Sequence, residues 1–120
     1  SGAKDHGRGN RVEGRLDEGA RAVVVEDLIS TGGSAVETVE ALRAAGARVL
    51  GIVSIFTYNM KKGLERLAAA GVKNVSLTDF DALVPVAIAE GYIGAEAAPR
   101  LLAFRDDPSD QRWINRGEDA

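Results

Sequence analysis

Two carboxylates and a glycine-rich turn stand close together in the stretch VVVEDLISTGGS, residues 23–34. Glu26 and Asp27 follow a run of valines, and the segment STGGS, here called the glycine turn (residues 30–34), follows soon after. Successive backbone N–H groups of such a turn can converge on an anion, because glycine tolerates positive φ and has no side chain to block close approach. Carboxylates repel phosphate but accept hydrogen bonds from sugar hydroxyls. The combination predicts a ribose 5-phosphate, with its phosphate in the glycine turn and its vicinal hydroxyls facing the acids.

Other glycine-rich loops do not fit this stretch. No lysine follows the glycines, as the G-x-x-x-x-G-K-[ST] loop of nucleoside triphosphatases requires, and the spacing is not the G-x-G-x-x-G of dinucleotide-binding folds. The hydroxyls of Ser30, Thr31 and Ser34 can add donors to an anion, and the acids can hold a water of a bound metal ion. A plain strand-to-helix turn with a polar N-cap is the alternative that these residues leave open.

The flanking residues predict an alternation of strands and helices. The valines predict a strand over 20–28 that is buried on both faces, followed by a helix that begins near Ser34 and ends at Gly46. Beyond it we expect a strand over 48–58, a helix over 59–71 and a strand over 72–77. This βαβαβ order predicts a Rossmann-like α/β fold with a parallel sheet and right-handed crossovers. Ligands of such sheets bind beyond the carboxyl ends of the strands, where the two acids are expected.

A helix should follow the third strand and run through 83–91. Thr78, Asp79 or Asp81 can cap its N-terminus. Pro85 is tolerable only near its first turn, because proline has no N–H to donate within a helix.

The remainder predicts a smaller helix and a polar tail. The helix is expected within 94–107. Trp113, the only tryptophan, should pack the tail and not stack on a base. Three strands are few for a doubly wound sheet. We therefore expect the chain to be the C-terminal part of a larger protein whose remaining strands precede Ser1.

Composition excludes several classes of function. The 120 residues suffice for one domain with a real core, and the net charge of -3 leaves no basic surface of the kind that nucleic acids or anionic membranes attract. The absence of cysteine excludes disulfides and thiolate sites and fits a reducing cytoplasm. The apolar runs are shorter than the roughly 20 residues that a membrane span needs.

The motif VVVEDLISTGGSA resembles the phosphoribosyl-pyrophosphate motif of the type I phosphoribosyltransferases. AKDHGRGNRVEG, near the N-terminus, resembles the mobile catalytic loop of orotate phosphoribosyltransferases, and LGIVSIFTYNM and LTDFDALVPVAIAEGYI are also similar to those enzymes. The resemblance covers nearly the whole chain. It implies a parallel-sheet type I core that is incomplete at its N-terminus, with a mobile loop at 1–14, an α/β core at 15–105 and a tail at 106–120.

The resemblance also implies a reaction and its residues. The activity would be transfer of the 5-phosphoribosyl group from phosphoribosyl pyrophosphate to orotate, with Mg²⁺ held mainly through the substrate. Lys4, His6 and Asp27 would be catalytic, with Lys4 and His6 reaching the pyrophosphate of the neighbouring subunit of a homodimer, and Ser30 would lie near orotate. The residues implied to bind phosphoribosyl pyrophosphate are Lys4, His6, Glu26, Asp27, Leu28, Ile29, Ser30, Thr31, Gly32, Gly33 and Ser34.

Alternatives remain at this point. Members of that family have a further N-terminal half that covers the base, so this chain alone is expected to be inactive, and another base remains possible. A non-catalytic module that senses phosphoribosyl pyrophosphate is the alternative from a different class, although a sensor has no need of Lys4 and His6. A lone histidine in a charged loop is otherwise ordinary solvated surface. Tyr58 and Asn59, at the end of the second strand, are weaker candidates for substrate contact.

Overall fold

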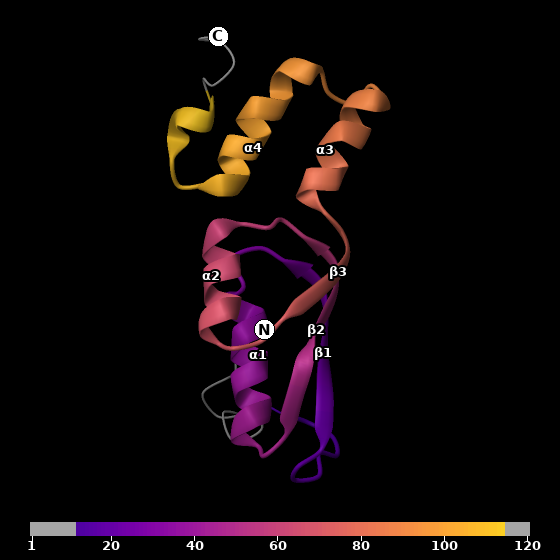
Figure 1. The fold of residues 1–120 in the computed structure, drawn as a ribbon, viewed down its shortest axis with the longest axis vertical. Helices are drawn as coiled ribbons and strands as arrows, with labels where there is room; N and C mark the ends of the chain where they lie inside the picture. Colours follow the sequence, from indigo (N-terminus) through magenta and orange to yellow (C-terminus); the bar gives the residue numbers. More distant parts are fainter. Residues whose placement is uncertain (1–11, 115–120) are drawn as a thin grey trace.

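A βαβαβ unit and a helical extension make up the fold seen in the computed structural model, which describes residues 12–114 (Figure 1). The unit consists of β1 (Arg21–Ile29), α1 (Gly33–Ala44), β2 (Arg48–Thr57), α2 (Lys61–Ala69) and β3 (Asn74–Asp79). The extension consists of α3 (Phe80–Ala89), the short helix η2 (Ala95–Ala97), α4 (Ala98–Asp106) and the short helix η3 (Gln111–Ile114). The predicted α/β fold is therefore confirmed.

The sheet has the order β1-β2-β3, and both pairs of strands are parallel. Val24 lies opposite Ile52, and Val53 lies opposite Val75. All three carboxyl ends therefore point the same way, toward α3 and α4 (Figure 1). The ligand edge that the sequence predicts is thus the edge that faces the helical extension.

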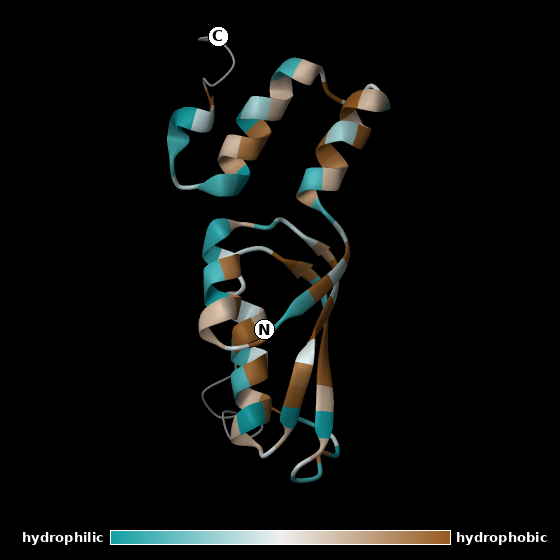
Figure 2. Ribbon diagram, in the orientation of Figure 1, coloured by the Kyte–Doolittle hydropathy of each residue, from teal (hydrophilic) through white to brown (hydrophobic). Residues whose placement is uncertain are grey.

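Helices α1 and α2 cover one face of the sheet (Figure 1). The core between them contains Val24, Val39, Ile52, Leu67 and Val72. The hydrophobic residues concentrate in the strands, whereas both helices also carry hydrophilic residues (Figure 2).

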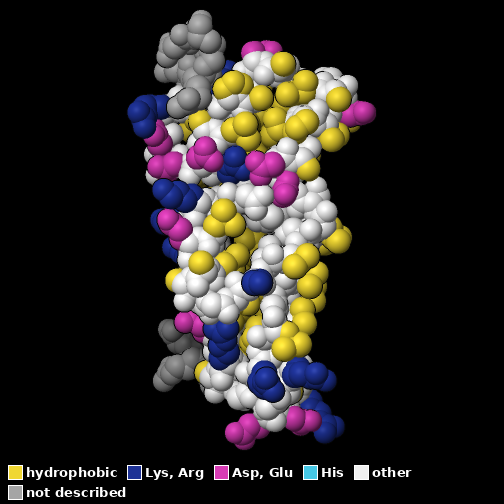
Figure 3. Space-filling view, in the orientation of Figure 1, with side chains coloured by type: hydrophobic (Ala, Val, Ile, Leu, Met, Phe, Trp, Pro, Cys, Tyr) yellow, Lys and Arg dark blue, Asp and Glu magenta, His cyan; other side chains and the backbone are white. Residues whose placement is uncertain are grey.

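The other face of the sheet is exposed among the described residues, so the prediction of a first strand buried on both faces is wrong for them. Val25 is 78% exposed, and its neighbours across the sheet, Val53 and Val75, are 43% and 67% exposed. Hydrophobic side chains accordingly line one flank of the strand region in the space-filling view (Figure 3). A run of valines is typical of a strand that is buried on both faces. In the described chain, helices cover only one face of the sheet.

The helix ends follow local chemistry. Gly46 has φ 94°, and the N–H groups of Gly46 and Ala47 donate to the carbonyls of Arg43 and Leu42, which is a Schellman motif and confirms the predicted stop. Of the three expected caps of α3, Asp79 is the one used: its carboxylate accepts from the N–H of Ala82 at 2.8 Å.

Helix α3 begins earlier than predicted, at Phe80, so Pro85 lies in its interior and not in its first turn. Residue 85 therefore gives no N–H to the carbonyl of Asp81, one turn earlier. Asp79 caps α3 and so sets its first residue at Phe80. The helix continues through Pro85 to Ala89.

Helix α4 packs beside α3, and the tail folds back on α4 (Figure 1). The rings of Phe104 and Trp113 meet edge to face with centroids 5.3 Å apart, which confirms that Trp113 packs the tail. None of the helices within residues 12–114 is both long and apolar enough to cross a bilayer.

Candidate functional site

The two acids lie within the last part of β1, which continues beyond them to Ile29. Glu26 pairs with Ser54 of β2 and is half-buried, whereas Asp27 is exposed. Successive side chains of a strand point to opposite faces, so the two carboxylates diverge, and Glu26 shares the face of buried Val24. Leu28 is 46% exposed and Ile29 is buried.

The glycine turn joins β1 directly to α1. Gly32 is the N-cap of α1 with φ 80°, and no side chain caps the helix. The polar N-cap that the alternative supposes is therefore wrong. Gly33 and Ser34 already belong to α1, so positive φ is used at Gly32 alone. The first N–H groups of a helix have no partner within the helix, so this end of α1 can receive an anion, favoured by the helix dipole.

Helix α2 packs against the glycine turn, which the sequence analysis did not predict. Gly63 lies so close that a Cβ there would be 2.5 Å from the carbonyl oxygen of Ser30. One turn later, a guanidinium N–H of Arg66 donates to the carbonyl of Thr31 at 3.1 Å. The only signal for this contact in the sequence is a glycine inside a helical pattern, which often has a packing reason.

The end of β2 supplies a second group of residues at the same edge. Asn59 has φ 57°, unusual for a residue other than glycine, and its side-chain amide donates to Asp81 at 2.9 Å. The ring of Tyr58 lies between those of Phe56 and Phe80, with centroids 5.3 and 5.5 Å away. Tyr58 and Asn59 thus have structural partners, and their contact with substrate stays a prediction.

Asp81 links this edge to α4. Its carboxylate accepts from Asn59 and forms an ion pair with Arg105 at 2.6 Å. The hydrogen bond from Asn59, followed by that from Arg105, lowers the pKa of Asp81 below its ordinary value. Asp81 is therefore ionised throughout the neutral range and holds the β2–α2 turn and α4 together.

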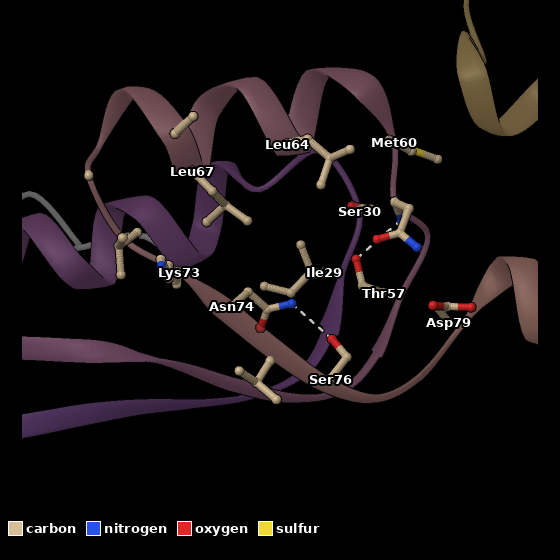
Figure 4. Close-up of a pocket in the computed structure, with 16 residues that line it drawn as sticks. Ile29, Ser30, Thr57, Met60, Leu64, Leu67, Lys73, Asn74, Ser76 and Asp79 are labelled. Carbon is tan, nitrogen blue, oxygen red and sulfur yellow. Dashed lines mark hydrogen bonds between the residues drawn. The ribbon is translucent and has the colours of Figure 1, made fainter.

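A cleft of about 790 Å³ lies between α2 and β3 (Figure 4). Leu64 and Leu67 line its helix side, and Asn74 and Ser76 line its strand side, where the amide of Asn74 donates to Ser76 at 2.8 Å. At the carboxyl edge of the sheet the cleft reaches Ser30 of the glycine turn. The volume is in the range of small-molecule pockets.

Two predicted site residues and the predicted metal ion are not part of the site as described. Lys4 and His6 lie outside the described residues. Within residues 12–114, no group of three or more histidine and acidic residues could hold a metal ion. The two acids and the glycine turn thus follow one another from β1 into α1, and the structure adds α2, which packs against the turn.

Comparisons with known proteins give a consistent result. No family model matches the chain. The curated orotate phosphoribosyltransferase of Bacillus cereus (strain G9842) is 54% identical over 114 residues, which are 95% of this chain and 54% of the relative. The chain therefore spans about half the length of the curated relatives that it matches.

Solved structures agree in fold. The UMP synthase of Leishmania donovani matches 78% of this chain and 21% of its own, with a TM-score of 0.67 and 29% identity. A phosphoribosyltransferase from Corynebacterium diphtheriae matches 64% of this chain and 47% of its own, with a TM-score of 0.51 and 32% identity.

Proposed function

We propose that this chain, a member of the type I phosphoribosyltransferase family, is the ribose-phosphate-binding part of an orotate phosphoribosyltransferase. The whole enzyme would transfer the 5-phosphoribosyl group from phosphoribosyl pyrophosphate to orotate, giving orotidine 5-monophosphate and pyrophosphate in pyrimidine biosynthesis. The observation that carries the proposal is the glycine turn, a helix N-terminus without a side-chain cap next to two acids. The 54% identity to an orotate phosphoribosyltransferase supports the choice of base.

The 5-phosphate would bind in the glycine turn. The uncapped N–H groups at the start of α1 and the hydroxyls of Thr31 and Ser34 are its donors. Asp27, whose carboxylate is exposed, and Glu26 would accept hydrogen bonds from the ribose hydroxyls. Leu28 and Ile29 would contribute backbone between the acids and the turn, and Ser30, which also borders the cleft, would approach orotate.

The reaction would be a direct displacement at C1 of the ribose. The bond from C1 to the pyrophosphate oxygen breaks, and N1 of orotate forms the new bond to C1 and gives its proton to the pyrophosphate or to water. No covalent intermediate with the protein is needed. Positive charge develops on the ribose in an oxocarbenium-like transition state, close to the carboxylates of Glu26 and Asp27. Negative charge grows on the pyrophosphate, and a well-placed donor to such charge is worth about a hundredfold or more in rate.

Lys4 and His6 would supply donors to the pyrophosphate from the neighbouring subunit of a homodimer. Mg²⁺, when bound, would neutralise charge on the pyrophosphate. The exposed carboxylate of Asp27 suits a hydrated ion that the substrate phosphates hold and that the protein touches through water. We place the reaction in the cytoplasm, which the absence of cysteine supports, and expect the 120-residue chain by itself to be inactive.

The ribose assignment is tested by Asp27→Asn in a protein in which this chain is preceded by the N-terminal part of the Bacillus cereus relative. The substitution removes an anionic acceptor for the ribose hydroxyls, so calorimetry should show phosphoribosyl pyrophosphate binding weakened by about tenfold or more, because hydrogen bonds to charged groups contribute roughly 1.5–3 kcal/mol. Orotate binding should change far less. Equal weakening of both ligands would refute the ribose assignment.

A further inference from the structure

Helix α2 touches the glycine turn through backbone. A Cβ on Gly63 would lie 2.5 Å from the carbonyl oxygen of Ser30, and a Cβ on Gly32 would lie 3.4 Å from the backbone of Gly63. Glycine inside a helix costs about 1 kcal/mol relative to alanine. Helix formation alone therefore disfavours a glycine at position 63. The close approach of α2 to the glycine turn explains why Gly63 stands there.

Arg66 extends this contact by one helical turn. Its guanidinium donates to the carbonyl of Thr31 at 3.1 Å, and the same nitrogen lies 3.3 Å from the position that a Cβ on Gly33 would occupy. The side chain therefore lies beside the turn, with a hydrogen bond at Thr31 and a close approach at Gly33. A planar guanidinium with several fixed donors suits this role better than the flexible ammonium of lysine.

These contacts determine where the N–H groups of the turn point. In a trans peptide unit the C=O and the following N–H point in opposite directions, and the structure has no cis peptide bond among the described residues. When α2 holds the carbonyls of Ser30 and Thr31 on its side, the N–H groups of Thr31 and Gly32 point away from α2. Within residues 12–114, no hydrogen bond uses either N–H.

We propose that Gly63 and Arg66 are positioning residues for phosphate binding. They hold the two carbonyls of the glycine turn against α2, so that the N–H groups of Thr31 and Gly32 stay directed at a phosphate monoester. This inference rests on the proposed function for the identity of the ligand. It concerns residues on a different helix from the motif, and the contacts that carry it are those of Gly63 and Arg66 with the backbone of the glycine turn.

The first test needs no ligand. In Arg66→Met the contact with Thr31 is lost, so the amide resonances of Thr31 and Gly32 should shift and their NMR order parameters should fall, because the two peptide units are no longer held against α2. Arg43→Met is the matched control, because Arg43 also donates to backbone carbonyls, those of Ala70 and Gly71, but away from the turn. Unchanged resonances and order parameters at Thr31 and Gly32 in Arg66→Met would overturn the inference, whatever the ligand is.

The second test titrates the 120-residue chain with ribose 5-phosphate, followed by the amide shifts of the glycine turn. Arg66→Met should bind about tenfold more weakly, Arg66→Lys should recover only part of the loss, and Arg43→Met should bind as the parent chain does. Full recovery in Arg66→Lys would mean that only the charge matters and would overturn the positioning role. If the parent chain binds no better to ribose 5-phosphate than to ribose, the proposed function fails instead, which the ligand-free test distinguishes.

Discussion

Single residues in this chain decide how the backbone passes from β1 to α1. Gly32 has the positive φ that the bend between β1 and α1 requires. Because Gly32 is also the N-cap, no side chain caps the N-terminus of α1. The acids and the glycine turn could be identified from sequence, because their chemistry depends on residue type and local spacing. The contact of Arg66 with Thr31 could not, since it joins residues 35 positions apart, and no local pattern specifies its partner.

Gly63→Ala tests the contact between α2 and the glycine turn. Alanine would favour the helix by about 1 kcal/mol, but its Cβ would overlap the carbonyl oxygen of Ser30, and overpacking of this kind costs about 1–3 kcal/mol. We expect a net loss of stability in urea unfolding. A variant as stable as the parent chain, or more stable, would show that α2 does not press on the glycine turn.

At the scale of elements, the order of strands and helices could be predicted from the sequence. The burial of the strands and the first residue of α3 could not. The change of hydrophobic period at Ser34 and the glycine at 46 indicate α1, and the structure confirms both signals. The exposure of Val25 could not be predicted, because a valine run is the same whether one face or both are covered. The interior position of Pro85 was missed because three residues could have capped α3, and Asp79 starts the helix early.

Acid should loosen α4 before it unfolds the sheet. The pKa of Asp81 is lowered in the folded state, so its contribution to stability is present above the ordinary carboxyl value near pH 4 and is lost as the pH falls through the lower folded value. Trp113, which packs on Phe104 of α4, reports this step by its fluorescence. The transition should lie below pH 4.

Asp81→Asn provides the comparison for this acid transition. The substitution removes the ion pair with Arg105, so α4 should be less stable already at neutral pH. The loss of stability should be roughly 0.5 kcal/mol, because the pair is partly exposed and screened. Asp106→Asn is the control, since Asp106 also pairs with Arg105, whereas the side-chain amide of Asn59 donates to Asp81. The same loss of pH dependence in both variants would contradict the role assigned to Asp81.

On the scale of the whole molecule, the described chain is elongated, 56 by 27 by 23 Å, with α3 and α4 beyond the carboxyl edge of the sheet (Figure 1). The active site of the proposed enzyme would need parts outside residues 12–114, including Lys4 and His6. Mixing inactive Lys4→Ala with inactive Asp27→Asn subunits of the longer protein should restore partial activity, because a heterodimer would contain one intact site. No recovery under conditions of subunit exchange would argue that the loop acts on its own subunit.

The central claim concerns the base as well as the ribose phosphate. The most direct measurement is base consumption by the protein that combines this chain with the N-terminal part of the Bacillus cereus relative. It would be supplied with phosphoribosyl pyrophosphate and Mg²⁺ and offered orotate, uracil, adenine or hypoxanthine in parallel. We predict consumption of orotate alone, with release of pyrophosphate. Consumption of another base would contradict the assigned substrate, and consumption of none, with phosphoribosyl pyrophosphate still bound, would identify a sensor instead of an enzyme.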